Sequence, residues 1–209
     1  MRIAQTEVFT FAELTPAAQK VAIAAEQQSQ AELFQFETDD IAQICVIIGI
    51  QNPEFSWSGF YSQGDGFSFT GSYVYATQAL AKIKAYAPQD IELHKIVAVL
   101  QDLQKSHGYR LTADITRDHG CRYSHENSVT IQAYKSGEEV VSLPYAHRYK
   151  LGDIGLSGID EFEECFKSLM RHFYKMVESE YEYQTGEECA REYLTDSDNE
   201  YTADGKLWS

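Results

Sequence analysis

The stretch from Phe55 to Tyr75 reads FSWSGFYSQGDGFSFTGSYVY, and it decides the fold that we expect for the chain. Aromatic residues alternate with serine or threonine on both sides of a Gly-Asp-Gly turn. A period of two is typical of β-strands with one buried face. Only Phe60, next to Gly59, departs from the alternation, which indicates a bulge or a close approach of another group to the backbone. The sequence therefore predicts an aromatic β-hairpin closed by the SQGDG turn.

Beyond this hairpin, apolar residues recur with helical spacing in several segments. Start signals such as Thr15-Pro16 and Asp90, and stop signals such as Gly49 and Gly108, bound these segments. We expect helices over residues 15–33, 38–48, 77–86, 91–107 and 159–183. Thr185 and Glu188 have the spacing of a capping box, which predicts one more short helix.

Strand-like alternation returns in residues 109–116, 128–134 and 140–145, which predicts an antiparallel meander. Residues 1–11 indicate an opening strand, and the ending EYTADGKLW indicates a small edge hairpin. We therefore expect one α+β domain over residues 1–209, with an acidic helical segment at about 184–209. In it, the aromatic hairpin and the meander form one antiparallel sheet, and the long helix packs on its apolar face.

The composition fits one large domain that is strongly acidic. The chain has 209 residues, is 44% apolar, and carries a net charge of −15. Residues 160–209 hold 14 acidic and 5 basic residues. Direct contact with a nucleic-acid backbone is not expected at this charge. The charge favours a partner protein with a basic surface, or it serves solubility alone.

Targeting signals and cysteine pairs are missing from the sequence. The N-terminus has no apolar run of the signal-peptide kind, and no stretch is long and apolar enough to span a membrane. The four cysteines, Cys45, Cys121, Cys165 and Cys189, form no CxxC pair and are expected to be free thiols. We expect a cytoplasmic protein without membrane contact.

Two polar insertions between the patterned strands are the candidate site. They are the SQGDG turn and the segment DHGCRYSHEN, residues 118–127. We hypothesise that both converge on one surface, where Arg122 pairs with Asp65 or Glu126. The alternative is a core hairpin whose turn only needs glycine, beside an exposed polar hairpin. The residues proposed to bind a ligand or partner are Ser58, Phe60, Tyr61, Gln63, Asp65, Arg122, His125 and Glu126.

Neither a metal site nor a catalytic site follows from these motifs. His119, Cys121, His125 and Glu126 are zinc-ligand types, but their spacing matches no known zinc module. Cys121 or Cys189 could act as a nucleophile only with a nearby base, and chance cysteine–histidine pairs are common in such a chain. We therefore assign no catalytic residue, no metal ligand and no cofactor.

Three stretches carry a resemblance to known sequences: SGFYSQGDGFSFTGSY, RYSHENSV and EYTADGKLW. With the opening pattern of Phe11, Glu13, Leu14, Ala18 and Gln19, the chain resembles a family of uncharacterised phage and prophage proteins, some of them labelled antitoxins. The resemblance implies a phage accessory protein acting in the cytoplasm of a bacterial host. It also implies a shared surface site at the recurring polar positions, which are Ser58, Gln63, Asp65, Arg122, His125 and Glu126. This chain has Phe67 where small residues often stand.

From these observations we expect an acidic accessory protein that binds a host defence or regulatory protein and modulates or inhibits it. One alternative is a protein or enzyme that binds a nucleotide-like small molecule, whose base stacks on aromatic rings while Arg122 and His125 meet phosphate. A second alternative is a nucleic-acid mimic that uses the acidic C-terminal segment.

Overall fold

A computed structural model describes residues 6–29, 35–117, 120–135 and 158–208. Their contacts divide the chain into two compact units. We call residues 36–176 the sheet unit, and residues 1–35 with 177–209 the terminal unit. Among the described helices, none is long and apolar enough to cross a membrane.

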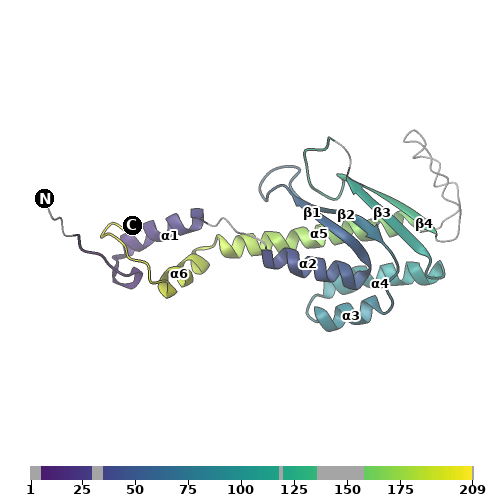
Figure 1. Cartoon of the computed structure of the whole chain (residues 1–209), viewed down its shortest axis with the longest axis horizontal. Coiled ribbons are helices and arrows are strands. Elements are labelled where there is room, and N and C mark those ends of the chain that lie inside the picture. The colour runs from purple at the N-terminus through teal and green to yellow at the C-terminus, as the bar shows by residue number, and fades with distance from the viewer. Residues whose placement is uncertain (1–5, 30–34, 118–119, 136–157, 209) are drawn as a thin grey trace. The chain divides into compact units, whose positions relative to one another are not determined.

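The sheet unit contains a four-stranded antiparallel sheet in the order β1-β2-β3-β4 (Figure 1). The strands are β1 (Ile50–Trp57), β2 (Phe67–Tyr73), β3 (Leu111–Arg117) and β4 (Val129–Lys135). The α+β class, and one sheet shared by the hairpin and the meander, are therefore confirmed. The strand predicted at residues 140–145 lies outside the described residues.

The aromatic alternation holds better in β2 than in β1. In β2, Phe67, Phe69 and Tyr73 are all buried. In β1, the register shifts between Gln51 and Glu54, where the backbone bulges. Of the two alternatives predicted for Gly59–Phe60, the bulge does not form, because β1 ends at Trp57 and both residues belong to loop 58–66. The other alternative, a close approach to the backbone, is confirmed at Gly59, where a Cβ would lie 3.1 Å from Asp65 Oδ2. Among the described strands, β1 pairs with β2 alone and so lies at an edge of the sheet, where a bulge is a common device.

Helices gather on one side of this sheet (Figure 1). They are α2 (Gln35–Ile48), α3 (Ala79–Tyr86), α4 (Ile91–Ser106) and α5 (Ile159–Gln184), although α5 runs beyond the sheet unit. Asp90 caps α4 as expected, since its Oδ1 accepts the Leu93 N–H at 2.9 Å. Gly49 ends α2 with a φ of +105°, and a Cβ there would lie 2.1 Å from the Val74 carbonyl oxygen. The predicted helix start at Asp90 thus acts through a capping hydrogen bond, and the predicted stop at Gly49 through a positive φ and a close backbone contact.

Aromatic rings from β2 and α5 form the centre of the core. Phe173 lies 6.0 Å from Phe67 and 6.1 Å from Phe69, measured between ring centroids. Tyr73 lies 5.6 Å from Phe162 and 5.1 Å from Phe166 in edge-on contacts. These contacts confirm that the long helix packs on the apolar face of the sheet. Ring pairs at such spacings add to the stabilisation that their burial provides.

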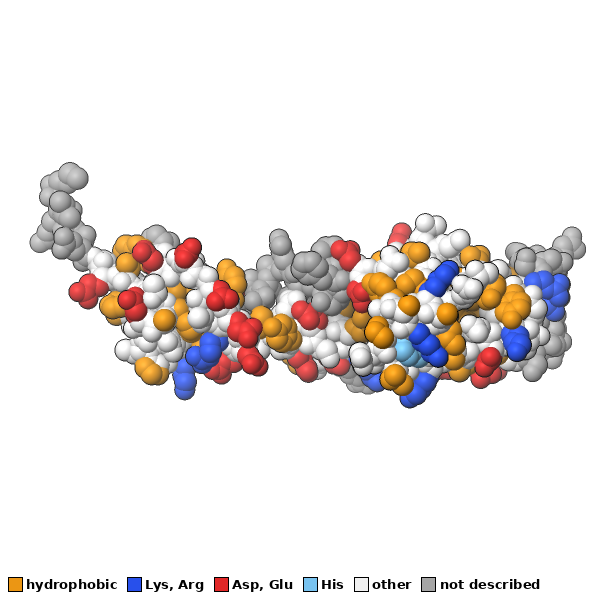
Figure 2. Space-filling model, turned by 90° about the horizontal axis from the view of Figure 1, so that it is seen from below, with side chains coloured by type: hydrophobic (Ala, Val, Ile, Leu, Met, Phe, Trp, Pro, Cys, Tyr) orange, Lys and Arg blue, Asp and Glu red, His pale blue; other side chains and the backbone are white. Residues whose placement is uncertain are grey.

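The terminal unit is built from the two ends of the chain. It contains a 3-10 turn η1 (Phe11–Glu13), α1 (Pro16–Ser29), the last part of α5, and α6 (Glu187–Asp196). On the face drawn in Figure 2, its charged side chains are mostly acidic. Its core is formed by Phe11, Leu14, Ala18, Ala22, Ile23, Ala190, Leu194 and Tyr201.

Backbone pairing joins the chain ends within this unit. Phe9 and Tyr201 exchange two backbone hydrogen bonds of 2.9 and 2.8 Å. The expected opening strand is thus reduced to one bridge among the described residues. The C-terminal hairpin is confirmed, because Tyr201 pairs with Leu207 and the Thr202 N–H donates to the Lys206 carbonyl at 2.9 Å.

One predicted cap is wrong and another was missed. The N-cap of α6 is Gly186, whereas the Thr185 hydroxyl donates to the Tyr181 carbonyl at 2.6 Å and so belongs to the end of α5. The reciprocal capping contact is instead at Thr10, whose N–H donates to Glu13 Oε2 at 2.9 Å. Helix α1 starts as predicted, since the Ala18 N–H donates to Thr15 Oγ1 at 3.3 Å.

Candidate functional site

Two loops meet at one end of the sheet. Loop 58–66, here called the glycine loop, joins β1 to β2, and residues 120–128, here called the histidine segment, lead into β4. Because β2 and β3 are antiparallel neighbours, the start of β2 and the end of β3 lie at the same end of the sheet. The topology therefore brings both polar insertions together.

The two loops contact each other closely, with the backbone of each against side chains of the other. The Ser124 N–H donates to Ser58 Oγ at 3.4 Å. A Cβ built on Gly66 would lie 2.5 Å from the Cβ of His125, and one built on Gly64 would lie 2.6 Å from the Tyr123 ring. Glycine is needed at Gly66 because of this close approach, since its φ lies outside the left-handed region.

Asp65 holds the glycine loop in shape. Its Oδ2 accepts the backbone N–H groups of Tyr61 and Ser62 at 2.9 and 2.6 Å. The same carboxylate lies against Gly59, where a Cβ would be 3.1 Å from Oδ2. The expected ion pair between Asp65 and Arg122 does not form.

Helix α5 supports both loops with residues that the sequence analysis did not select. The Tyr174 hydroxyl donates to the Gly59 carbonyl at 3.2 Å, and its ring stacks on Phe60 at 5.7 Å. Arg171 contacts Glu126 of the histidine segment at 3.6 Å. The expected pair of Glu126 with Arg122 is therefore replaced by a pair with Arg171. Only the position of both residues beside the buried stripe of α5 could have indicated them.

Two arginines of this region have no carboxylate partner among the described residues, so no ion pair offsets their positive charges. Arg117 Nη2 donates to the Tyr123 carbonyl at 3.2 Å and to Ser124 Oγ at 3.0 Å, which are both neutral acceptors. Arg122 is exposed. Within the described parts of the chain, no carboxylate lies within ion-pair distance of either guanidinium.

His125 presents one ring nitrogen as a donor. Its Nδ1 accepts the Asn127 N–H at 3.0 Å, which places the proton of the neutral ring on Nε2. The imidazole also stacks on Tyr123, with 6.2 Å between ring centroids. The ring orientation is thus set from both sides.

Aromatic side chains remain exposed around these polar groups. Tyr61 is 79% exposed, Tyr123 50% and Trp57 39%. Gln63 is exposed as well, and Phe60 is half-buried against α5. We call the surface formed by the glycine loop, the histidine segment and Trp57 the loop platform. The eight residues selected from the sequence all lie in it.

Within the described residues, the metal-ligand residue types form no cluster, and two cysteines have raised pKa values. No group of three or more His, Cys, Asp or Glu side chains that could hold a metal occurs in the described ranges, and His119 lies outside them. Burial, followed by the nearby Glu161 and Glu164, raises the pKa of Cys165 to about 12. Burial and then Glu192 also raise the pKa of Cys189. A reactive cysteine needs a lowered pKa, so neither thiol is a good nucleophile.

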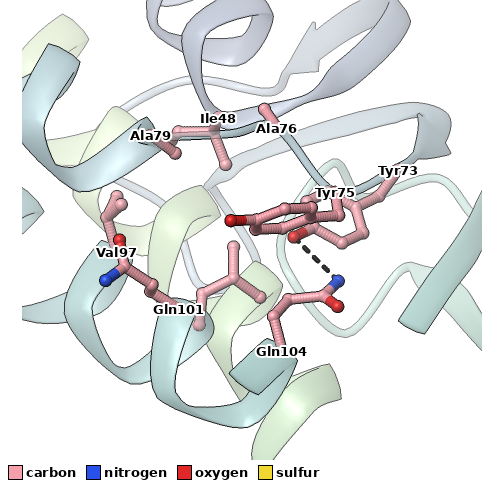
Figure 3. Close-up of a pocket in the computed structure, with 9 residues that line it drawn as sticks. Ile48, Tyr73, Tyr75, Ala76, Ala79, Val97, Gln101 and Gln104 are labelled. Carbon is pink, nitrogen blue, oxygen red and sulfur yellow. Dashed lines mark hydrogen bonds between the residues drawn. The ribbon is translucent and has the colours of Figure 1, made fainter. Parts of the chain in front are cut away.

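A small pocket lies away from the loop platform, between α2, β2, α3 and α4 (Figure 3). Buried Gln104 lines it and donates from Nε2 to the Tyr73 hydroxyl at 3.1 Å and to the Leu111 carbonyl at 2.7 Å. Gln104 Oε1 accepts the Leu111 N–H at 3.1 Å. The pocket has room for little more than one water molecule, which is far too small for a nucleotide. Gln104 could have been found as a polar residue within the apolar stripe of α4.

The fold and the site define an α+β protein whose two hairpin loops are supported by one long helix. The chain belongs to a family described as a domain of unknown function (DUF8835), which it matches over residues 33–187. No curated protein and no solved structure was found to be similar to the chain. The family match covers the whole sheet unit and ends at the first residue of α6.

Proposed function

We propose that this protein is a phage- or prophage-encoded accessory protein that binds a host defence or regulatory protein and modulates or inhibits it. The observation that supports this proposal is the loop platform, which is firmly held yet exposes several aromatic rings. Asp65 and Tyr174 fix the backbone beneath it, while Tyr61 stays 79% exposed. Exposed aromatic residues beside an arginine are typical of the energetic centre of protein–protein interfaces.

The shape of this surface favours a macromolecular partner over a small molecule. Sites for small ligands are concave and bury most of the ligand. The rings of Tyr61, Tyr123 and Trp57 are instead exposed, and the small pocket of Figure 3 is lined by residues outside the loop platform. A nucleotide-like ligand that stacks on the rings and meets Arg122 and His125 therefore remains the alternative function, with weaker support.

A second contact is proposed for the terminal unit. Residues 1–35 and 177–209 carry 14 acidic and 4 basic residues. Tyr183 and Tyr193 are both more than half exposed among these charges, at 54% and 53%. This arrangement supports a host partner with a basic surface, and nucleic-acid mimicry is its extreme form.

The phage assignment has its own separate basis. It follows from the resemblance of the SGFYSQGDG and RYSHENSV stretches, which now lie together in the loop platform. We place the protein in the cytoplasm of the bacterial host on the same ground. A family described only as a domain of unknown function is compatible with this origin.

Site-specific photo-crosslinking in host lysate tests the proposal. A photoreactive phenylalanine analogue replaces Tyr61 in the loop platform, Tyr193 in the terminal unit, or Tyr86 on α3 as a control; all three are exposed tyrosines. We expect one host protein to be captured at Tyr61, identified by mass spectrometry, and displaced by excess unmodified protein. Capture at Tyr193 alone would move the function to the terminal unit. Equal capture at all three positions would contradict a specific interaction.

A further inference from the structure

The carboxylates of the loop platform are already satisfied within the protein. Asp65 accepts two backbone N–H groups from its own loop. Glu126 is paired with Arg171 of α5. Asp65 Oδ2 and Glu126 Oε1 are therefore already engaged in contacts that shape the platform.

The groups that remain are hydrogen-bond donors. Arg122 is exposed and, within the described ranges, contacts no carboxylate. Arg117 donates to two neutral acceptors, so these contacts do not offset its charge. The proton on His125 Nε2 is a third donor, since Nδ1 is occupied by the Asn127 N–H. Two cations and a ring N–H thus stand beside the exposed Tyr123, which is 50% exposed.

We infer that the loop platform recognises an acidic segment of its partner protein, in which carboxylates alternate with apolar side chains. This inference rests on the proposed function and names the partner chemistry of the same surface. Arg122 meets a carboxylate through a two-pronged, charge-assisted contact. The rings of Tyr61, Tyr123 and Trp57 cover the apolar side chains on either side.

A protein segment fits this surface better than other anions do. A nucleic acid carries a charge on every nucleotide and would need many cations, whereas the chain has a net charge of −15. A free phosphate would meet Arg122 at an exposed, water-filled surface, where one ion pair provides little affinity. A peptide segment needs only one or two carboxylates and gains contact area from the rings. The remote acidic charges of the chain are screened over about 8 Å at physiological salt.

Peptide binding to the full-length protein tests the inference. The probes are fluorescent synthetic peptides that share one leucine-containing scaffold and carry glutamate, glutamine or lysine at alternate positions. We expect glutamate peptides to bind about tenfold more tightly than lysine peptides. Arg122→Glu should abolish or invert this preference, and Arg122→Gln should abolish it. Lys82→Glu on α3 makes the same change of net charge at another exposed position and should leave the preference intact.

Each other outcome overturns the inference. These outcomes are an equal affinity for all peptides, a preference for lysine, no binding of glutamate peptides at about millimolar concentration, or the same loss with Lys82→Glu. A single-stranded oligonucleotide that binds more tightly than the glutamate peptides, or inorganic phosphate that displaces them at equal concentration, overturns it too. Crosslinking at Tyr61 separates the two claims. A captured protein without an acidic segment rejects this inference only, whereas no captured protein rejects the proposed function.

Discussion

The two units of this chain are stabilised in different ways. The sheet unit buries large rings such as Phe67, Phe173 and Tyr73 against one another. The terminal unit has a smaller core in which alanines are prominent, and its two chain ends are joined by the backbone pair of Phe9 and Tyr201. Its charges also differ, with 14 acidic and 4 basic residues against 18 and 13 in residues 36–176. The family match thus covers the unit with the larger aromatic core, whereas the acidic terminal unit depends on contacts between segments far apart in the sequence.

The largest effect is expected from truncating the aromatic core of the sheet unit. Phe173→Ala removes a fully buried ring that contacts both Phe67 and Phe69. We expect the free energy of unfolding to fall by about 4 kcal/mol. Chemical denaturation followed by tyrosine and tryptophan fluorescence measures the loss. Tyr174→Phe, the neighbouring change, keeps its ring and should cost far less, so equal losses would contradict the importance of this core.

A change at Gly205 should loosen the terminal unit by itself. Gly205 has a φ of +83°, and a Cβ there would lie 2.1 Å from the Ala18 carbonyl oxygen. Gly205→Ala should destabilise the terminal unit by about 3 kcal/mol. Amide hydrogen exchange should accelerate in α1 and α6 but not in β2 and β3. Gly120→Ala is the matched control, because Gly120 has a φ of +88° with nothing within 4 Å, and only backbone strain is expected there.

Removing the buried amide of the sheet unit should also destabilise it. Gln104→Leu leaves the N–H and carbonyl of Leu111 without their partner, and the Tyr73 hydroxyl loses its donor. We expect a loss of about 2 kcal/mol in the free energy of unfolding. Gln101→Leu, at a less buried position lining the same pocket, provides the control. A stable Gln104→Leu protein would show that hydrophobic packing replaces this network.

The opposite result is expected for a buried hydroxyl of the terminal unit. Tyr201 is 3% exposed, and its hydroxyl has no hydrogen-bond partner among the described residues. Tyr201→Phe removes an unsatisfied polar group and should stabilise the terminal unit by up to about 1 kcal/mol. Thermal unfolding and hydrogen exchange in α6 measure the change. A clear destabilisation would indicate that the hydroxyl does have a partner in the folded protein.

The smallest effect concerns the C-terminal hairpin at low pH. Hydrogen bonds from Lys206 and then Thr202 lower the pKa of Asp204 to about 2, below its ordinary value of 3.8. A lowered pKa in the folded state means that this contact stabilises the hairpin above pH 3.8, and that the stabilisation is lost as the pH falls through about 2. Titration of the Asp204 carboxyl carbon by NMR checks the value. Lys206→Ala should raise this pKa towards 3.8.

Much of the fold could be predicted because its signals are local and periodic. The buried stripes of α4 and α5, the Asp90 cap and the alternation in β2 and β3 all depend on residues a few positions apart. Thr185 was misplaced because a capping box and the end of a preceding helix use the same short sequence pattern. Residues of the third predicted strand, 140–145, are not described, so that prediction stays open.

The contact between the two loops could also be predicted from the order of the antiparallel strands. The hydrogen-bond partners of the residues in these loops could not be predicted. Asp65 bonds to backbone N–H groups within its own loop, which a count of charges does not reveal. The bond from Tyr174 to Gly59 joins residues 115 positions apart, and no local pattern specifies such a pair. The same holds for Gln104, whose role depends on the buried backbone N–H and carbonyl of Leu111, the first residue of β3. Local sequence patterns therefore predicted which surface to consider, whereas the role of each residue on it depends on tertiary contacts that the sequence does not reveal.

The joining of the chain ends has a consequence for protein synthesis. Helix α1 is made well before the residues that it contacts, as in the bond from Gln27 to the Thr185 carbonyl 158 residues later. The sheet unit is complete on the nascent chain before the terminal unit can close. Until those residues are made, α1 lacks the segment that it packs against in the folded protein. Its alanine- and glutamine-rich sequence suits this delay, because it offers little apolar surface to chaperones or to other nascent chains.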